Sequence, residues 1–257
     1  MTDNEKLSFQ LGILGGMGPY ATAKILEEII RLTDARSDAE HIPVLICNDP
    51  RIPDRTAAIC RGETSPLKML YQVLDFLNQS NVSLIIMPCN TSHYYFDLLQ
   101  SRSAAPIINM VETTIRYTEN KFKNKTICCL CTKGTVQAKV YERYLSKRNS
   151  MMELSDNAQH SIMDVIYNMK AGVNTELCGQ QLVSIMQSIA TNIDPVFIYG
   201  CTELSILRDY VDSRVDYKTI DANEVLAASS IITLGYKIKE TETKIDVESL
   251  SQLVIGS

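Results

Sequence analysis

The sequence predicts an α/β protein made of two similar halves, each with a mainly parallel sheet flanked by helices. The apolar run Leu84–Met87 ends at Pro88 and leads through Cys89 and small polar residues into a helix-like segment. The stretch PVFIYGCTEL, residues 195–204, repeats this order. An apolar run closed in this way is typical of a buried parallel strand that leads into a helix.

Each half places one cysteine at the end of its strand. The halves align without a gap from Cys89 to Asn109 and from Cys201 to Asp221. Ligands of open α/β sheets bind at the carboxyl ends of the strands, and a helix N-terminus favours a thiolate. The pattern predicts that two thiols face one site. The alternative is two buried core cysteines, because free cysteine is often buried.

Three stretches carry a resemblance to a known family. LGILGGMGP at 11–19, IIMPCNTSH at 85–93 and IYGCTEL at 198–204 resemble the aspartate/glutamate racemases, which are cofactor-independent amino acid racemases, and more closely their aspartate racemase-like branch. The similar order of strands and helices extends to about Lys239. The resemblance implies two pseudo-symmetric α/β domains with the active site in the cleft between them.

Length and composition fit this organisation. The 257 residues can bury a sizeable core, and 45% hydrophobic and 21% charged residues are ordinary for a globular protein. We expect a first domain of residues 1–105 plus 222–257 and a second of residues 106–221. The net charge of −5 argues against nucleic acid as a partner, and no apolar run approaches the length of a membrane span. Residues 1–10 lack the apolar core of a signal peptide, so we expect a cytoplasmic location. Whether the chain forms a homodimer stays open.

The eight cysteines are expected to be reduced thiols, because the chain carries no secretion signal. Cys128 and Cys131 have the C-x-x-C spacing of redox and metal sites. However, residues 126–131 have the pattern of a buried strand, whose side chains alternate between faces, and no second Cys or His pair lies nearby in sequence. We therefore predict no metal site.

The first strand, Phe9–Leu14, leads through a glycine-rich turn to Pro19 and a helix at Ala21–Leu32. The turn lacks the G-x-G-x-x-G spacing of dinucleotide sites, but its glycines allow close approach of the backbone to a small ligand. The family resemblance places Met17 in the substrate pocket. The alternative for Met17 is a packing role.

A charged loop, NDPRIPDR at 48–55, follows the second predicted strand, His41–Cys47. Arginine can bind a carboxylate through two parallel hydrogen bonds. The resemblance to racemases of acidic amino acids indicates Arg55 as the ligand of the substrate's side-chain carboxylate, with Arg51 as the rival. The alternative is that both arginines are solvated loop residues.

Two further candidates lie in the second half. The family pattern suggests Lys170 as a second cation for the acidic side chain, whereas the helix dipole explains a lysine at a helix C-terminus equally well. Thr132 opens a T-K-G-T turn, whose amides and hydroxyls are suited to bind a carboxylate.

The other elements follow from apolar periodicity. No function is assigned to the tail, residues 240–257. We expect helices at 65–78, 92–100, 111–118, 136–147, 159–170, 180–190 and 224–239, and strands at 106–109, 126–131, 151–154 and 217–221.

Paired thiols suit the removal and return of a proton at the Cα of an amino acid. One thiolate acts as the base on one face, and the opposite thiol acts as the acid on the other, since a tuned cysteine can reach a pKa near the working pH. Backbone amides with Asn90, Thr91 and Thr132 are expected to stabilise the carboxylate of the carbanion, while Thr91 and Thr202 hold the thiolates. We expect no pyridoxal phosphate and no other cofactor.

The predicted function is racemisation of a small-molecule substrate, an acidic amino acid, with Cys89 and Cys201 as the two bases. Aspartate is favoured and glutamate is not excluded. In the family's glutamate-specific branch a histidine often follows G-C-T, and Glu203 in its place points away from that branch. His93, one helical turn after Cys89, could tune that thiol or cap the helix, and Glu203 could act as a local partner of Cys201.

Other functions remain as alternatives. Hydantoin racemase, maleate isomerase and arylmalonate decarboxylase activities belong to the same superfamily and use similar cysteines. A catalytically silent amino-acid-binding protein built on two lobes is the alternative from another class.

Overall fold

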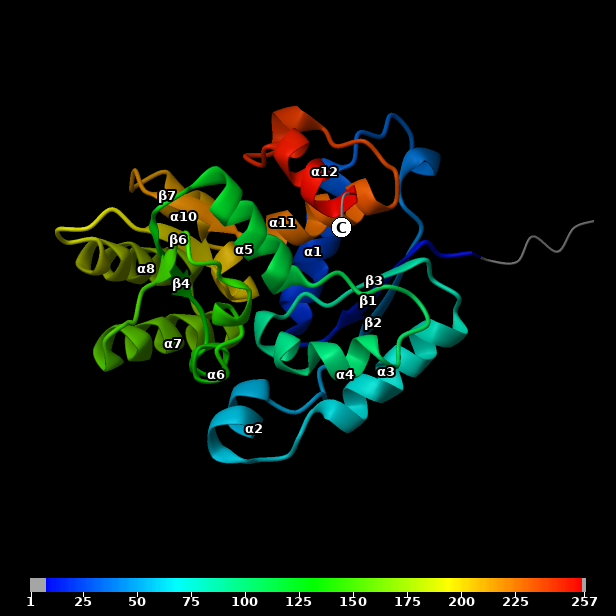
Figure 1. Cartoon of the computed structure of the whole chain (residues 1–257). Coiled ribbons are helices and arrows are strands. Elements are labelled where there is room, and N and C mark those ends of the chain that lie inside the picture. The colour runs from blue at the N-terminus through cyan, green and yellow to red at the C-terminus, as the bar shows by residue number, and fades with distance from the viewer. Residues whose placement is uncertain (1–7, 256–257) are drawn as a thin grey trace, which may run out of the picture.

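The computed structural model describes residues 8–255, in which two parallel sheets lie side by side (Figure 1). The first sheet has the strand order β2–β1–β3 and the second has the order β5–β4–β6–β7. In the first sheet, β1 lies between β2 and β3, and in the second, β4 lies between β5 and β6. Strands β3 and β6 are the ones that lead to Cys89 and Cys201. The strands are Leu11–Gly15 (β1), Val44–Asn48 (β2), Leu84–Ile86 (β3), Thr126–Leu130 (β4), Ser150–Met151 (β5), Val196–Tyr199 (β6) and Lys218–Asp221 (β7).

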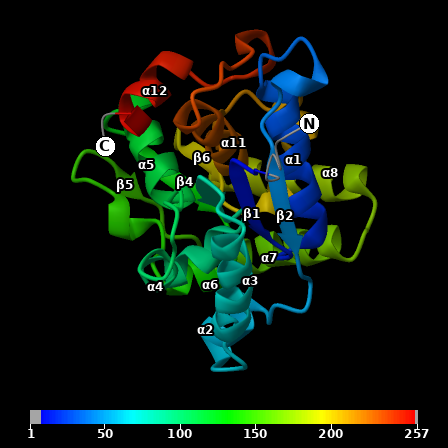
Figure 2. The same cartoon turned by 90° about the vertical axis from the view of Figure 1, so that its right-hand side faces the viewer.

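Helices cover the sheets, which confirms the predicted α/β class. Figure 2 shows the first sheet between α1 and α3, and both helices contact β1. The α-helices are Pro19–Leu32 (α1), Arg55–Arg61 (α2), Leu67–Gln79 (α3), Phe96–Gln100 (α4), Met110–Lys121 (α5), Lys133–Gln137 (α6), Asp156–Lys170 (α7), Thr175–Ile189 (α8), Thr202–Ser205 (α9), Arg208–Asp212 (α10), Ala222–Thr233 (α11) and Val247–Ile255 (α12). The 3-10 helices are Asp38–Glu40 (η1), Asn90–Tyr95 (η2), Glu142–Tyr144 (η3) and Glu240–Glu242 (η4).

The core is continuous between the two halves. One cluster of buried residues joins Leu11 and Ile13 of β1 to Ile127 of β4 and Ile198 of β6, through side chains of α5 and α11. Burial of one such aliphatic side chain is worth roughly 1.5–3 kcal/mol. Because this shared core fixes one sheet against the other, the ends of β3 and β6 are held close to one site.

Two predicted helices end earlier than expected. Residues 136–147 do not form one helix: α6 ends at Gln137, Lys139 has a φ of 49°, and Tyr141 turns into the core. Residues 224–239 form a helix only to Thr233, because Gly235, with a φ of 80°, ends α11 in a left-handed turn.

Three smaller differences concern the first half and the tail. The predicted strand 106–109 is reduced to one bridge between Ile107 and Ile85. The predicted helix 92–100 begins as the 3-10 helix η2 before α4. The tail forms α12, which packs against α5 and α11 through the buried Leu250. Residues 1–7 and 256–257 of the predicted first domain lie outside the described residues.

Helix α2 lies where the sequence predicts only a charged loop and the residues after it. Asp54 is its N-cap and accepts a hydrogen bond from the Ala57 amide at 2.6 Å, and Gly62 ends it at a φ of 66°. The helix belongs to the first half but packs on α6 of the second, below both sheets in Figures 1 and 2. It therefore bridges the two halves.

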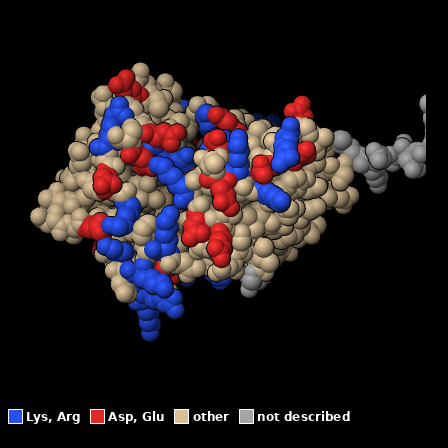
Figure 3. All heavy atoms as spheres, turned by 90° about the horizontal axis from the view of Figure 1, so that it is seen from above, with Lys and Arg blue, Asp and Glu red and all other residues tan. Residues whose placement is uncertain are grey.

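Charges of both signs share the surface. On the face seen in Figure 3, acidic and basic side chains lie next to each other. The ion pairs of the protein include Lys244–Asp212, at 2.8 Å. Within residues 8–255, the helices are all too short or too polar to cross a bilayer.

Candidate active site

One pocket brings together the two catalytic cysteines and the seven substrate-binding residues predicted from the sequence. It lies where β3 and β6 end, with a cavity volume of about 20 Å³, which is room for roughly one water molecule. Its lining comprises Met17, Arg55, Cys89, Asn90, Thr91, Thr132, Lys170, Cys201 and Thr202, together with Asp54, Thr56, Gly200 and Glu203.

Cys89 is the N-cap of η2 and is buried. Its sulfur accepts a hydrogen bond from the Ser92 hydroxyl at 3.2 Å, and the same hydroxyl lies 3.0 Å from the Met17 sulfur. A hydroxyl has one proton to donate, so it serves one sulfur at a time. Cys89 thus sits in an environment that offers its sulfur a donor.

His93 contacts the backbone of Cys89 and not its thiol. The ring Nε2 accepts a hydrogen bond from the Met110 amide at 3.1 Å, so Nδ1 is the nitrogen that donates to the Cys89 carbonyl at 3.0 Å. Burial lowers the pKa of His93 to about 4, so the ring is neutral at pH 7. His93 ties the turn after Cys89 to the start of α5, and it does not line the pocket.

Cys201 has the opposite hydrogen-bonding role. It is the N-cap of α9, and its thiol donates to Glu203 Oε2 at 3.0 Å. The Thr202 hydroxyl donates to the same oxygen at 3.2 Å. Burial raises the pKa of the Cys201 thiol well above its usual value, and the Glu203 carboxylate raises it further. Cys201 is therefore a thiol at neutral pH, and the two cysteines are chemically distinct.

Arg55, at the start of α2, is buried in the pocket. Its terminal nitrogens donate to the carbonyls of Ile52 and Pro53, at 3.1 and 2.9 Å, and of Met17, at 3.1 Å. Arg51, the rival candidate, is largely exposed and pairs with Asp49 at 2.8 Å. The structure thus brings Arg55 to the pocket and leaves Arg51 outside it.

Two buried donors of the pocket lack a partner among the described residues. They are Nε of Arg55 and Nδ2 of Asn90. The Tyr141 hydroxyl donates to Asn90 Oδ1 at 2.6 Å, which fixes the orientation of the amide. An unpaired buried donor is unfavourable by roughly 1–3 kcal/mol, so this pair indicates a ligand with acceptor oxygens.

Lys170 reaches the pocket from the last turn of α7. Its ammonium lies 3.7 Å from Glu203 Oε1. Burial lowers the pKa of Lys170, but the Glu203 carboxylate and the Cys201 sulfur outweigh burial, so the pKa is raised overall. Lys170 is charged, and it already faces one carboxylate of the protein.

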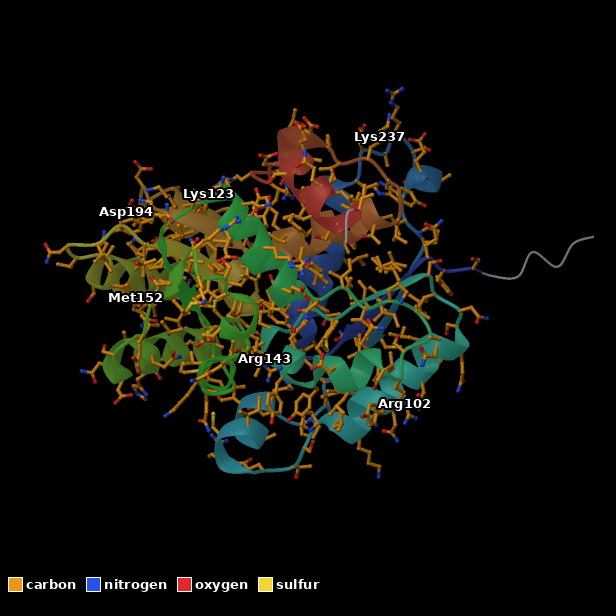
Figure 4. The ribbon with its side chains drawn as sticks, in the orientation of Figure 1. Arg102, Lys123, Arg143, Met152, Asp194 and Lys237 are labelled. Atoms are coloured by element: carbon orange, nitrogen blue, oxygen red, sulfur yellow. The ribbon has the colours of Figure 1, made fainter. Side chains whose placement is uncertain are left out.

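Polar contacts close the pocket between the halves. The hydroxyls of Thr91 and Thr132 lie 2.9 Å apart, and Thr135 is 3.0 Å from Thr91. Arg143, labelled at the junction of the two halves in Figure 4, lies over the Tyr94 ring, 5.7 Å from its centre.

The two turns singled out in the sequence act differently from expectation. Gly16 approaches the Asp49 backbone and not the pocket: a Cβ there would lie 2.2 Å from the Asp49 carbonyl oxygen. In the T-K-G-T turn, Thr132 accepts the Thr135 amide as the N-cap of α6, and the Lys133 amide contacts the Met163 sulfur. These amides are therefore engaged within the protein.

Asp54, Thr56 and Gly200 also line the pocket and were not selected from the sequence. Asp54 directly precedes Arg55 and is the N-cap of α2. Aspartate is a preferred N-cap residue, so the sequence does contain a signal for the start of this helix. Gly200 is required by packing: a Cβ would lie 2.5 Å from the Cys129 sulfur. Residues 8–255 contain no cluster of three or more His, Cys, Asp or Glu side chains suited to bind a metal ion.

A duplicated parallel α/β fold, with equivalent cysteines from both halves in one pocket, defines the class of the protein. The model of the Asp/Glu/hydantoin racemase family matches residues 14–229, and the chain belongs to this family. The family predicted from the sequence is thereby confirmed, and membership identifies the chain as an amino acid racemase.

Individual relatives agree with this assignment. The broad specificity amino-acid racemase RacX of Bacillus subtilis (strain 168) is 26% identical over 234 residues, which cover 88% of this chain and 99% of that protein. The structure of Picrophilus torridus aspartate racemase matches with a TM-score of 0.80 at 25% identity, covering 94% of this chain and 99% of that one. Glutamate racemase of Francisella tularensis in complex with D-glutamate has the same fold, with a TM-score of 0.61 at 18% identity over 97% and 94% of the chains.

Proposed function

We propose that the protein racemises an acidic amino acid, with aspartate as the preferred substrate, by a two-base mechanism without pyridoxal phosphate. The observation that carries the proposal is the pair of thiols: Cys89 and Cys201 occupy equivalent strand ends and line one pocket. One sulfur accepts a hydrogen bond and the other donates one. This is the arrangement that a base and an acid on opposite faces of Cα require.

The reaction uses the thiols in turn. In the proposed first direction, Cys89 removes the Cα proton as a thiolate, and the Cys201 thiol donates a proton to the opposite face. The product then leaves Cys89 protonated and Cys201 as the thiolate, which is the form that acts on the other enantiomer. Asn90 Nδ2 is available to a substrate carboxylate, whose charge grows in the carbanion.

The charge of the pocket supports an acidic substrate. Arg55 is buried and makes no ion pair with any carboxylate of residues 8–255. A buried cation without a counterion is unfavourable, so a second carboxylate on the ligand complements it. The relatives of the chain include aspartate, glutamate and broad specificity racemases, which is consistent with this class of substrate.

Substrate entry requires the pocket to open. A cavity of about 20 Å³ is too small for an amino acid. Because α2 and the threonine hydroxyls close the pocket between the halves, we propose that α2 moves away from α6 to admit the substrate and then packs back against the bound molecule.

Racemisation is tested with single enantiomers of aspartate, glutamate and neutral amino acids in D₂O, without pyridoxal phosphate. Chiral chromatography should show the opposite enantiomer of aspartate, and mass spectrometry should show deuterium at Cα. The double variant Cys89→Ala/Cys201→Ala is the control and should do neither. Binding of aspartate without deuterium uptake by the wild-type protein would instead identify a silent binding protein.

A further inference from the structure

We propose that Glu203 is the internal proton acceptor of Cys201: when Cys89 is protonated and serves as the opposite acid, Glu203 takes the thiol proton and leaves Cys201 as the thiolate base. The proposal rests on the two-base racemisation proposed above and deepens it. It gives a proton-transfer role to a residue that the thiol pair alone does not require.

Hydrogen bonding defines the path of the proton. The Cys201 thiol donates to Glu203 Oε2 over 3.0 Å, and both side chains are buried. In the proposed step the S–H bond breaks and an O–H bond forms on Oε2. The negative charge moves from the carboxylate to the sulfur, so the pair has one proton and one negative charge before and after this transfer. No solvent proton has to leave the closed pocket.

Neighbouring groups stabilise the single negative charge of the Cys201–Glu203 pair. The Lys170 ammonium lies 3.7 Å from Glu203 Oε1, on the side away from the thiol. The same oxygen lies next to Gly18, the N-cap of α1, where a Cβ would be 3.3 Å away, and a helix N-terminus favours negative charge. The other ionisable groups facing this end of the pocket are Arg55 of α2, Cys89 before η2 and Tyr141 before η3.

The first half has no such acceptor. In the alignment of the halves, Thr91 takes the place of Glu203, and its hydroxyl is engaged with Thr132 and Thr135. The Cys89 sulfur instead accepts from Ser92. The proposed relay therefore serves one thiol only, and its removal should affect one face of Cα.

The test is Glu203→Gln, which keeps the size of the side chain but removes the proton acceptor. The Cα proton exchange of each aspartate enantiomer is measured in D₂O, and Cys201→Ala shows which enantiomer depends on Cys201. For that enantiomer, Glu203→Gln should lower exchange by roughly 10²–10⁴-fold, the usual contribution of a proton-transfer group. Exchange of the other enantiomer should stay within about threefold of wild type, because Cys89 alone removes and returns that proton. Racemisation should fall equally in both directions.

A pH profile separates proton transfer from structural support. In wild type, exchange on the Cys201 face should vary little between about pH 6 and 8, because the proton stays within the pair. In Glu203→Gln the thiol must lose its proton to solvent, so the rate should rise about tenfold per pH unit. Glu203→Asp, which keeps a carboxylate, should restore part of the rate and the flat profile.

The outcomes distinguish this proposal from the racemase proposal. Glu176→Gln, an exposed glutamate in the first turn of α8, is the matched control and should leave both exchange rates unchanged. If Glu203→Gln exchanges both enantiomers at near wild-type rates, or loses both equally while still folded by circular dichroism, the relay is wrong. Absence of exchange in the wild-type protein would instead reject the racemase proposal itself.

Discussion

Thr56 and Gly134 are packed so closely that a methyl group on Gly134 would lie 2.9 Å from both Cα and Oγ1 of Thr56. Thr56 belongs to α2 of the first half and lines the pocket, and Gly134 belongs to α6 of the second. Because backbone meets backbone here, neither residue can move aside without a shift of its helix. The closed state of the pocket thus depends on a glycine at position 134.

Gly134→Ala should hold α2 away from α6 and weaken substrate binding. An extra methyl group in a packed contact is unfavourable by roughly 1–3 kcal/mol, which corresponds to a KM for aspartate raised about fivefold to 150-fold. Steady-state kinetics by chiral chromatography measure this. Gly235→Ala is the control: Gly235 has a φ of 80° and open space around it, so the variant should lower thermal stability without raising KM. An unchanged KM in Gly134→Ala would contradict the closure of α2 on α6.

The fold could be read from the sequence because each half repeats a clear pattern. Strands before Cys89 and Cys201 are short apolar runs, and most helices have one apolar face. Errors arose where tertiary contacts override periodicity. Tyr141 leaves the expected helix to donate a hydrogen bond to Asn90, and Ile107 makes only one bridge at the edge of its sheet.

The pocket could be predicted only in part, because its residues are far apart in sequence. The cysteines carried their own signal, and the family pattern indicated Arg55 and Lys170. No sequence signal could show that the terminal nitrogens of Arg55 bind backbone carbonyls, or that Lys170 faces Glu203. These contacts join residues that are far apart in the sequence, and only the folded structure reveals them.

Arg55→Ala should raise the KM for aspartate far more than the KM for a neutral amino acid. Loss of a buried cation that meets a carboxylate weakens binding by about 2–4 kcal/mol, or roughly 30–1000-fold. Arg51→Ala is the matched control, since Arg51 is exposed on the same loop and pairs with Asp49. Kinetics with both substrates measure the difference. An equal increase in KM for the acidic and the neutral substrate would show that Arg55 does not determine substrate selectivity.

His93 should make the fold less stable as the pH falls below about 6.5. Burial lowers the pKa of His93 from 6.5 to about 4, so the unfolded chain takes up a proton before the folded one does. The stabilisation is present above pH 6.5 and is lost as pH falls to 4, by about 3 kcal/mol in total. Urea unfolding between pH 4 and 7 measures it. His93→Gln should be less stable at pH 7 but should lack this dependence, whereas His160→Gln, on the surface, should keep it. Parallel profiles for wild type and His93→Gln would contradict the buried neutral ring.

The cysteines should each govern one enantiomer. Cys89→Ala and Cys201→Ala should both abolish racemisation, because the planar intermediate then lacks an acid on one face. Each variant keeps one thiol, which can still remove a proton and return one on its own side. Both should therefore exchange the Cα proton with D₂O at a reduced rate, and with opposite enantiomers of aspartate.

Mass spectrometry of the recovered enantiomers measures this exchange, with chiral chromatography to show that no interconversion occurs. Cys178→Ala is the control: Cys178 is buried in α8 and does not line the pocket, so its loss should leave both enantiomers exchanging. A variant that still interconverts the enantiomers at near wild-type rate would indicate a single-base mechanism. If both variants exchange the same enantiomer, the two sulfurs do not lie on opposite faces of Cα, and the symmetry of the halves does not extend to the chemistry.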